Sequence, residues 1–205
     1  VRQPQLFLDV ALHVGTLIST IVVLRNEISS LLRGVLSYTL HQVRGEPHAV
    51  SDEQRAMARL AGMVCIALIP TGLLGFFFMD QFERLFGSLP AVGVMLMVTG
   101  SILWLTRGAG KGVKDMGALS VMDVLVIGFI QGVAIAPGIS RSGSTISFGL
   151  FRKLQKNCAY NFSFLISIPA ILGAMILEWE TPDISSGELL PILAGTLSAA
   201  LAGYL

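Results

Sequence analysis

One segment of this 205-residue chain places an arginine among hydroxyl side chains and glycines, inside an otherwise apolar stretch of membrane length. The segment runs from Gly128 to Gly149 and reads GFIQGVAIAPGISRSGSTISFG. A guanidinium group presents its N–H donors in a planar fork that matches phosphate oxygens, and hydroxyls and free backbone amides add further donors. These residue types therefore predict a phosphate-binding site centred on Arg141.

The same segment should contain a break between two helices. Pro137 removes a backbone donor and clashes with the preceding turn, and Gly138 permits backbone angles that other residues resist. We expect a second helix to begin near Ser144 or Thr145, either of which can cap it. The unpaired N–H groups of its first turn would then point toward Arg141 and favour an anion.

The candidate site residues follow from this pattern. Arg141 and Ser140 are the candidate catalytic residues, and no metal ligand is assigned. The candidate phosphate-binding residues are Gly138, Ser142, Gly143, Ser144, Thr145 and Gln131. Ser140 is either a nucleophile or a phosphate ligand, and we favour the second role because no base in the chain is placed to activate it. Serines and glycines also serve helix packing alone, but an arginine at bilayer depth costs about 2.5–3.5 kcal/mol and is usually kept for a function.

The composition indicates an integral membrane protein of the all-α class. The chain is 53% hydrophobic and only 13% charged, which is more apolar surface than one soluble core of this length can bury. The net charge of +1 and the lack of a basic run with aromatics argue against a nucleic-acid partner. Cys65 and Cys158 are too far apart in the sequence to suggest a disulfide framework or a zinc pattern.

We expect a single integral membrane domain over residues 1–205. The predicted membrane spans are residues 6–24, 60–79, 91–106, 162–177 and 189–205. Residues 26–59 are predicted to be a cytoplasmic solvent loop, broken at Gly45 and Pro47, whose opening part from Ile28 is an amphipathic surface helix. Asp9, His13 and Asp123 are the titratable anomalies of the apolar stretches, and a hydrogen-bonded packing role is favoured for His13.

Residues 119–151 are predicted to form a re-entrant hairpin, because the break at Pro137 comes before any loop on the far side. Irregular backbone at membrane depth is tolerated only when it is buried in protein or lines a wet cavity. The polar stretches 25–59, 107–114 and 152–156 carry eleven of the fourteen basic residues. A re-entrant hairpin puts all three on one side, which the positive-inside rule makes the cytoplasm.

Four segments together resemble the bacterial undecaprenyl-diphosphatase family, also called the bacitracin-resistance protein family. They are PGISRSGSTIS, the preceding IGFIQGVA, FSFLISIPAILGA from Phe162 and FLDVALHVGTL from Phe7. The resemblance implies a bacterial inner-membrane enzyme that hydrolyses undecaprenyl diphosphate to the lipid carrier used in peptidoglycan synthesis. It also implies an inverted repeat whose two re-entrant hairpins meet in mid-membrane. By resemblance Arg141 matches the family's essential arginine, Ser140 the serine before it and Thr145 the following threonine.

The family's other signature has no counterpart in this sequence. It is a Glu-Gly-x-x-Glu-Phe-x-Pro stretch followed by Ser-Ser-Thr-Gly-His, and it supplies the acidic residues and the histidine implicated in activating water or holding a divalent ion. We therefore expect an internal fragment that is silent alone, and a divalent cation, Mg or Ca, whose ligands lie mostly outside it. Asn161 replaces a residue that is commonly charged in the family. The implied partners are a prenyl diphosphate lipid and membrane lipid, and a homo-oligomer is compatible with the sequence.

Three other functions share parts of this pattern. A transporter or lipid flippase also has broken helices with a midplane charge, and enzymatic turnover would distinguish it. The acid-phosphatase-like lipid phosphatases need a histidine shortly after their serine–arginine pair, whereas SGSTIS follows Arg141 here. A purely structural subunit has no need of Arg141.

Overall fold

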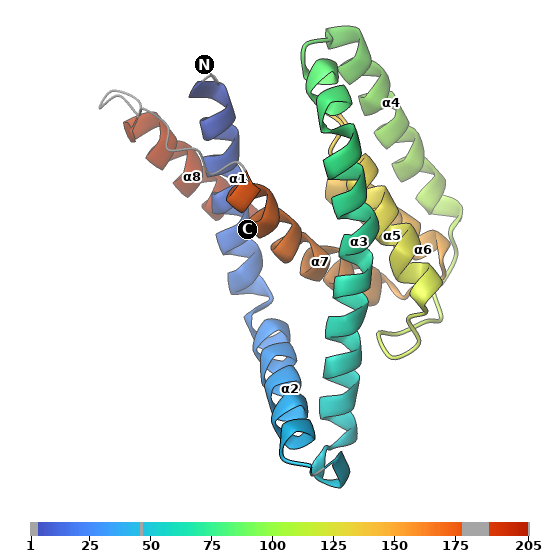
Figure 1. The fold of residues 1–205 in the computed structure, drawn as a ribbon. Helices are drawn as coiled ribbons and strands as arrows, with labels where there is room; N and C mark the ends of the chain where they lie inside the picture. The colour runs from blue at the N-terminus through green and yellow to red at the C-terminus, as the bar shows by residue number, and fades with distance from the viewer. Residues whose placement is uncertain (1–3, 46, 178–188, 205) are drawn as a thin grey trace. The chain divides into compact units, whose positions relative to one another are not determined.

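The computed structural model describes residues 4–45, 47–177 and 189–204, and within these ranges it contains helices and no strand (Figure 1). The predicted all-α class is confirmed. The helices are α1 (Pro4–Val23), α2 (Arg25–Val43), η1 (Pro47–Ala49), α3 (Asp52–Phe86), α4 (Leu89–Leu105), η2 (Thr106–Gly108), α5 (Val121–Val133), α6 (Arg141–Phe151), α7 (Lys156–Leu177) and α8 (Leu189–Tyr204). They form two compact units, residues 30–166 and the described parts of 1–29 and 167–205, which are described separately.

Three helical stretches are long and apolar enough to cross a membrane. They are Asp52–Phe86, Leu89–Gly108 and Lys156–Ile176, and they contain the predicted spans at 60–79 and 91–106 and most of the one at 162–177. The predicted spans at 6–24 and 189–205 are helical in their described residues, as α1 and α8, but neither helix meets the same test alone. The acidic loop that the sequence predicts at 178–188 lies outside the described residues.

Most of the stretch 26–59 is helical: the helix predicted from Ile28 is present as part of α2, and the helix that begins at Asp52 is not predicted. The cytoplasmic position of this stretch stays a prediction. The chain continues as α2 and turns at Gly45 and η1, as the breaker residues predict, and α3 begins at Asp52. A capping box of Ser51 and Gln54 starts α3. The Gln54 side chain also donates to Ser37 Oγ at 2.8 Å, and Gly34 of α2 is buried where a Cβ would meet the Met57 side chain. These contacts between distant residues fold the polar stretch into a helical pair.

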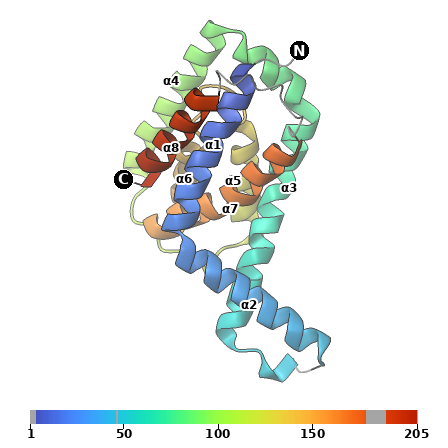
Figure 2. The same ribbon diagram turned by 90° about the vertical axis from the view of Figure 1, so that its left-hand side faces the viewer.

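The larger unit, residues 30–166, is organised around the hairpin of α5 and α6. In Figure 2 the order across this unit is α4, α6, α5, α3, in agreement with the contacts between these helices. The seam between α3 and α5 is very close, since a Cβ on Gly128 would lie 1.9 Å from the Ala67 carbonyl oxygen. Thr71 of α3 also donates to the Gly128 carbonyl at 2.8 Å. The absence of a side chain at Gly128 is therefore what lets α5 dock on α3.

Both ends of the hairpin are joined at one point. The backbone N–H of Val113 donates to the Lys153 carbonyl at 2.9 Å, and that of Gln155 donates to the Lys114 carbonyl at 2.8 Å. Helices of 13 and 11 residues rise only about 20 and 16 Å, less than the roughly 30 Å of a hydrocarbon core. The helix–turn–helix of the prediction is thus present and returns to the place where it started. Its re-entry into a membrane stays a prediction.

A buried carboxylate reinforces this closure. Asp123, in the first turn of α5, is fully buried and bonds to Lys114 Nζ at 2.9 Å and to Arg152 Nε at 2.7 Å. Ser120 Oγ donates to the same carboxylate at 2.7 Å. Lys114 precedes the hairpin and Arg152 follows it, so Asp123 ties the two ends together. Removing one partner of such a buried ion pair is strongly destabilising.

The smaller unit is built on the packing of α1 against α8. A Cβ on Gly15 would lie 2.3 Å from the Thr196 carbonyl oxygen, and one on Gly203 would lie 2.4 Å from Ser19 Oγ. Small residues at both positions let the two backbones approach closely, a common way for helices to associate in membranes.

We expect Gly128→Ala to destabilise the protein and Gly62→Ala, the matched control, not to. The added methyl at Gly128 collides with the backbone of α3, at a typical cost of about 1–3 kcal/mol. At Gly62 nothing lies within 4 Å of the new Cβ, and alanine favours the helix by up to about 1 kcal/mol. Thermal unfolding of the detergent-purified protein should show a midpoint lower by several degrees for Gly128→Ala only. Equal midpoints for the two variants would contradict the close seam.

Candidate functional site

All eight predicted site residues lie in the α5–α6 hairpin. Gln131 is on α5, and the others lie in the turn between the helices or in the first half of α6. Gly138 has a φ of +89°, which disfavours any residue with a side chain. A Cβ there would also lie 2.7 Å from the Val92 carbonyl oxygen of α4. The glycine is therefore required both by the turn and by the helix behind it.

Helix α6 begins earlier than the sequence suggests. Its first residue is Arg141 and its N-cap is Ser140, whose Oγ accepts from the Gly143 N–H at 3.2 Å. The prediction that Ser144 or Thr145 caps the helix is wrong, because Ser140 has the extended backbone of a cap and takes that place. The N–H groups of Arg141 and Ser142 have no acceptor among the described residues. The positive end of α6 thus starts at the arginine itself.

Three buried polar atoms of the hairpin have no hydrogen-bond partner among the described residues: Arg141 Nη1, Ser144 Oγ and Gln131 Oε1. Leaving one such group unsatisfied typically costs about 1–3 kcal/mol, and more when the group is charged. Arg141 and Ser144 can donate to phosphate oxygens, whereas Gln131 Oε1 can only accept, as from water or a protonated phosphate oxygen. This concentration of unsatisfied groups is what a ligand site requires.

The remaining hydroxyls of α6 differ in their engagement. Thr145 is buried, donates to the Arg141 carbonyl at 2.8 Å and lies within hydrogen-bond distance of Ser163 Oγ on α7. Ser147 Oγ is held by the Gly143 carbonyl at 2.6 Å. Ser142 is partly exposed and has no side-chain partner among the described residues. Phosphate binding by Ser142 and Thr145 stays a prediction, and the Thr145 hydroxyl meanwhile joins α6 to α7.

The neighbouring helices hold this hairpin through residues that the sequence analysis did not single out. Thr99 of α4 bonds to the Gly138 carbonyl and to the Ser140 N–H, at 3.0 and 3.1 Å. The Gln131 amide nitrogen donates to Thr71 Oγ1 at 3.3 Å and lies 3.5 Å from the Ile166 carbonyl oxygen. In the sequence, Thr99 is a threonine within an apolar span. Its presence there does not reveal which segment its hydroxyl binds.

Asp123 is the titratable residue that the sequence analysis singles out within this hairpin, and its carboxylate is already engaged. Both carboxylate oxygens of Asp123 are occupied by Lys114, Arg152 and Ser120. His13 lies on α1, in the smaller unit, and is exposed. The side chain of Asp9 lies outside the described residues.

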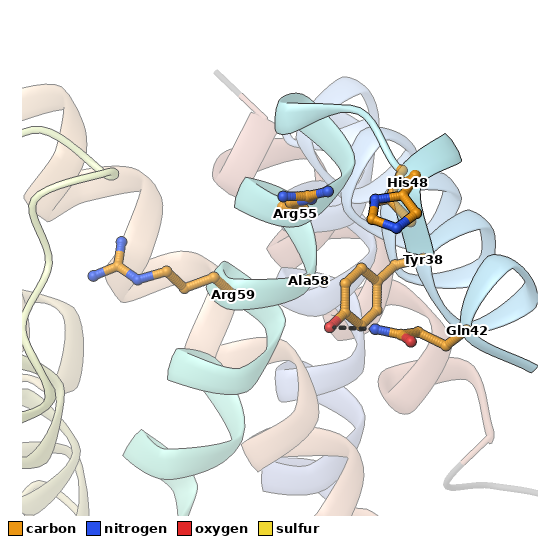
Figure 3. Close-up of a pocket in the computed structure, with 7 residues that line it drawn as sticks. Tyr38, Gln42, His48, Arg55, Ala58 and Arg59 are labelled. Carbon is orange, nitrogen blue, oxygen red and sulfur yellow. Dashed lines mark hydrogen bonds between the residues drawn. The ribbon is translucent and has the colours of Figure 1, made fainter. Parts of the chain in front are cut away.

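A cavity of about 650 Å³ lies elsewhere in the larger unit. Figure 3 shows its lining, to which Tyr38, Gln42, His48, Arg55 and Arg59 contribute. It is formed by α2, η1 and the start of α3, and it includes none of the predicted site residues. The Arg59 guanidinium donates to the carbonyls of Gly117 and Leu119 and so holds the loop before α5. We place the candidate site at the hairpin, because the unsatisfied donors are there.

Comparisons with known proteins point to one family. The family model described as bacitracin resistance protein BacA matches residues 2–205. An undecaprenyl-diphosphatase of Alkaliphilus metalliredigens is 39% identical over 97% of this chain and 72% of its own length. One from Desulfosudis oleivorans is 39% identical over 100% of this chain and 74% of its own. One from Methanothermobacter thermautotrophicus is 46% identical over 70% of this chain and 81% of its own.

Ser144→Ala should leave the fold at least as stable while weakening anion binding. The change removes an unsatisfied buried hydroxyl, so we expect an unfolding midpoint equal to or up to a few degrees above that of the parent. Titration calorimetry in detergent should show inorganic diphosphate binding at least about threefold more weakly.

Ser147→Ala is the matched control, because it removes a buried hydroxyl of the same helix that is bonded to Gly143. It should lower the midpoint by a few degrees and leave diphosphate affinity within about twofold. If the two variants lose equal stability, Ser144 Oγ has a partner within the protein, and its assignment to a ligand is wrong.

Proposed function

Because this chain belongs to the bacitracin resistance protein BacA family, we propose that it is a multi-pass membrane undecaprenyl-diphosphatase. It hydrolyses undecaprenyl diphosphate to undecaprenyl phosphate and inorganic phosphate. This reaction recycles the lipid carrier of peptidoglycan synthesis, and a resistance to bacitracin follows from the same activity. The observation that carries the proposal is the buried, unsatisfied guanidinium nitrogen of Arg141 at the first turn of α6.

The geometry of the hairpin supports the following division of roles. Arg141 grips the diphosphate oxygens and opposes the negative charge that develops during the reaction. The free N–H groups of Arg141 and Ser142 and the positive end of α6 add to this field. Ser140 Oγ is exposed and accepts from Gly143, so its own hydrogen remains available to a phosphate oxygen.

The bond changes are those of a hydrolysis. The oxygen of a water molecule bonds to the terminal phosphorus, and the bond from that phosphorus to the bridging oxygen breaks. The bridging oxygen leaves with the lipid monophosphate, and the water's oxygen stays in the inorganic phosphate. The protons of the water pass to the two phosphate products or to solvent. Arg141 and the α6 amides stabilise the charge that shifts onto the leaving phosphate. Asp123 is not the base that receives the water's proton, because its carboxylate is already held by two cations.

The described residues do not fit a divalent cation. Mg and Ca take oxygen ligands, with carboxylates prominent, whereas the predicted site residues offer a guanidinium, hydroxyls and one amide, and the Asp123 carboxylate is held by Lys114 and Arg152. Among the described residues no group of three His, Cys, Asp or Glu side chains could hold a metal ion. We therefore derive no step of the reaction through a cation.

We further propose that the hairpin enters the bacterial cytoplasmic membrane from the inner side and that its site opens to the outer face. The basic residues at the joined ends of the hairpin, Lys114, Arg152 and Lys153, support this orientation through the positive-inside rule. The turn with Arg141 lies at the opposite end of the hairpin from these charges.

In a full-length protein that contains this chain, Arg141→Lys should reduce phosphate release from a prenyl diphosphate by at least about tenfold, which corresponds to about 1.4 kcal/mol. Lysine keeps the positive charge but loses the planar two-pronged contact. Arg107→Lys makes the same chemical change at an exposed arginine that lies over Trp104, outside the hairpin, and should retain activity within about twofold. Both variants should purify in the amount of the parent. Activity of Arg141→Lys within about threefold of the full-length parent would refute its role, and a full-length parent without turnover would favour the flippase instead.

A further inference from the structure

Helix α4 packs against the turn between α5 and α6 and against the start of α6. A Cβ on Gly138 would meet the Val92 carbonyl oxygen, the Met95 Cβ and the Leu96 nitrogen, all within 3.3 Å. One turn further along α4, Thr99 bonds to the segment 138–140. Beyond it, the Leu103 side chain lies 3.4 Å from the position of a Cβ on Gly143. One face of α4 therefore follows the chain from Gly138 into α6.

On this face of α4, the Thr99 side chain makes the hydrogen bonds to the turn. It is 7% exposed, and it is the one residue of α4 that is buried, although α4 is a membrane-length apolar helix with many exposed side chains. Its hydroxyl donates to the Gly138 carbonyl at 3.0 Å and accepts from the Ser140 N–H at 3.1 Å. Both functions of the hydroxyl are used, so valine, which has the same shape, can replace neither bond.

The two bonds act directly on the start of α6. They hold the carbonyl before Ile139 and the N–H after it, and so fix the backbone that enters the cap. Ser140 then caps α6 through Gly143, and Arg141 is the next residue of the chain. The direction in which Arg141 and the free amides point is thus set by a side chain on another helix.

We propose that Thr99 is a positioning residue of the site: its hydroxyl fixes the turn at Gly138–Ser140 so that Arg141 and the first amides of α6 converge on the diphosphate. Thr99 does not touch the substrate and acts through Ser140. The proposal rests on the diphosphatase function for its effect on turnover, but its effect on the turn and on anion binding is independent of that function. A misplacement of about 1 Å in such a site can cost a hundredfold in rate.

Three variants of the protein separate this role from simple packing. Thr99→Val keeps the shape and removes both hydrogen bonds. Thr99→Ser keeps the hydroxyl and removes only a methyl group. Ser101→Ala removes an exposed hydroxyl of the same helix that bonds only to the Met97 carbonyl of its own turn.

The first measurement is hydrogen exchange of the peptide that contains residues 134–140, followed by mass spectrometry in detergent. In Thr99→Val the Ser140 N–H loses its acceptor, so we expect exchange to be at least about fivefold faster. Exchange in Thr99→Ser and Ser101→Ala should match the parent within about twofold. Unchanged exchange in Thr99→Val would overturn the proposal, because the turn would then be held by other contacts.

The second measurement is the affinity for inorganic diphosphate, together with kcat and KM for a prenyl diphosphate. Thr99→Val should bind diphosphate at least about fivefold more weakly and lower kcat at least about tenfold. Thr99→Ser should restore both to within about threefold. Faster exchange with unchanged affinity and kcat would overturn the positioning role, as would a serine variant no better than valine. Turnover is measured in a full-length protein that contains this chain. If that parent shows no turnover, the proposed function fails, and the diphosphate affinities alone decide the role of Thr99.

Discussion

The larger unit depends on the closure of the α5–α6 hairpin at its base. Its two helices, of 13 and 11 residues, are each shorter than a hydrocarbon core is thick, and the chain returns after them to the point at which the hairpin starts. The backbone bonds between residues 113–114 and 153–155 and the buried carboxylate of Asp123 enforce that return. An ion pair buried in this way repays its desolvation only with good geometry, and here two cations and a hydroxyl satisfy one carboxylate. The turn between α5 and α6, at the opposite end of the hairpin, takes no part in this closure.

At that end the structure leaves polar groups without partners, at a cost to stability. Arg141 Nη1, Ser144 Oγ and Gln131 Oε1 are buried and unsatisfied among the described residues, while Ser147 and Thr145 of the same helix are fully engaged. Close packing of the hairpin against α3 and α4 offsets the free-energy cost of these unsatisfied groups. Gly128 lets α5 lie directly on the backbone of α3, and Thr99 holds the turn against α4. These contacts hold the backbone of the turn, which is the condition that the proposed ligand site requires.

The sequence predicted those features of the site that depend on local chemistry. Pro137 and Gly138 mark the break between α5 and α6, which the structure confirms. An arginine with hydroxyls in an apolar segment indicates an anion site, which stays a prediction. The prediction for the start of α6 is wrong because Ser140, Ser144 and Thr145 are all good caps, and the sequence does not reveal that the Ser140 N–H donates to Thr99, 41 residues away. The pairing of α2 with the start of α3 is not apparent from the sequence, because the contact of Gly34 with Met57 has no local signature. The pairing of Asp123 with Arg152 is hidden in the same way by their separation of 29 residues.

The central claim, that residues 119–151 enter the membrane and return to the same side, is tested most directly by the accessibility of two introduced cysteines. Cys65 and Cys158 are first replaced by serine. Single cysteines are then placed at Lys111, which precedes the hairpin in the sequence, or at Gln155, which follows it; both positions are exposed. Gly112 is unsuitable, because a Cβ there would lie 1.9 Å from the Leu154 carbonyl oxygen. In sealed, oriented vesicles a membrane-impermeant thiol reagent should label both positions from the same side. Labelling of Lys111→Cys and Gln155→Cys from opposite sides would show that the segment crosses the membrane and would contradict the account.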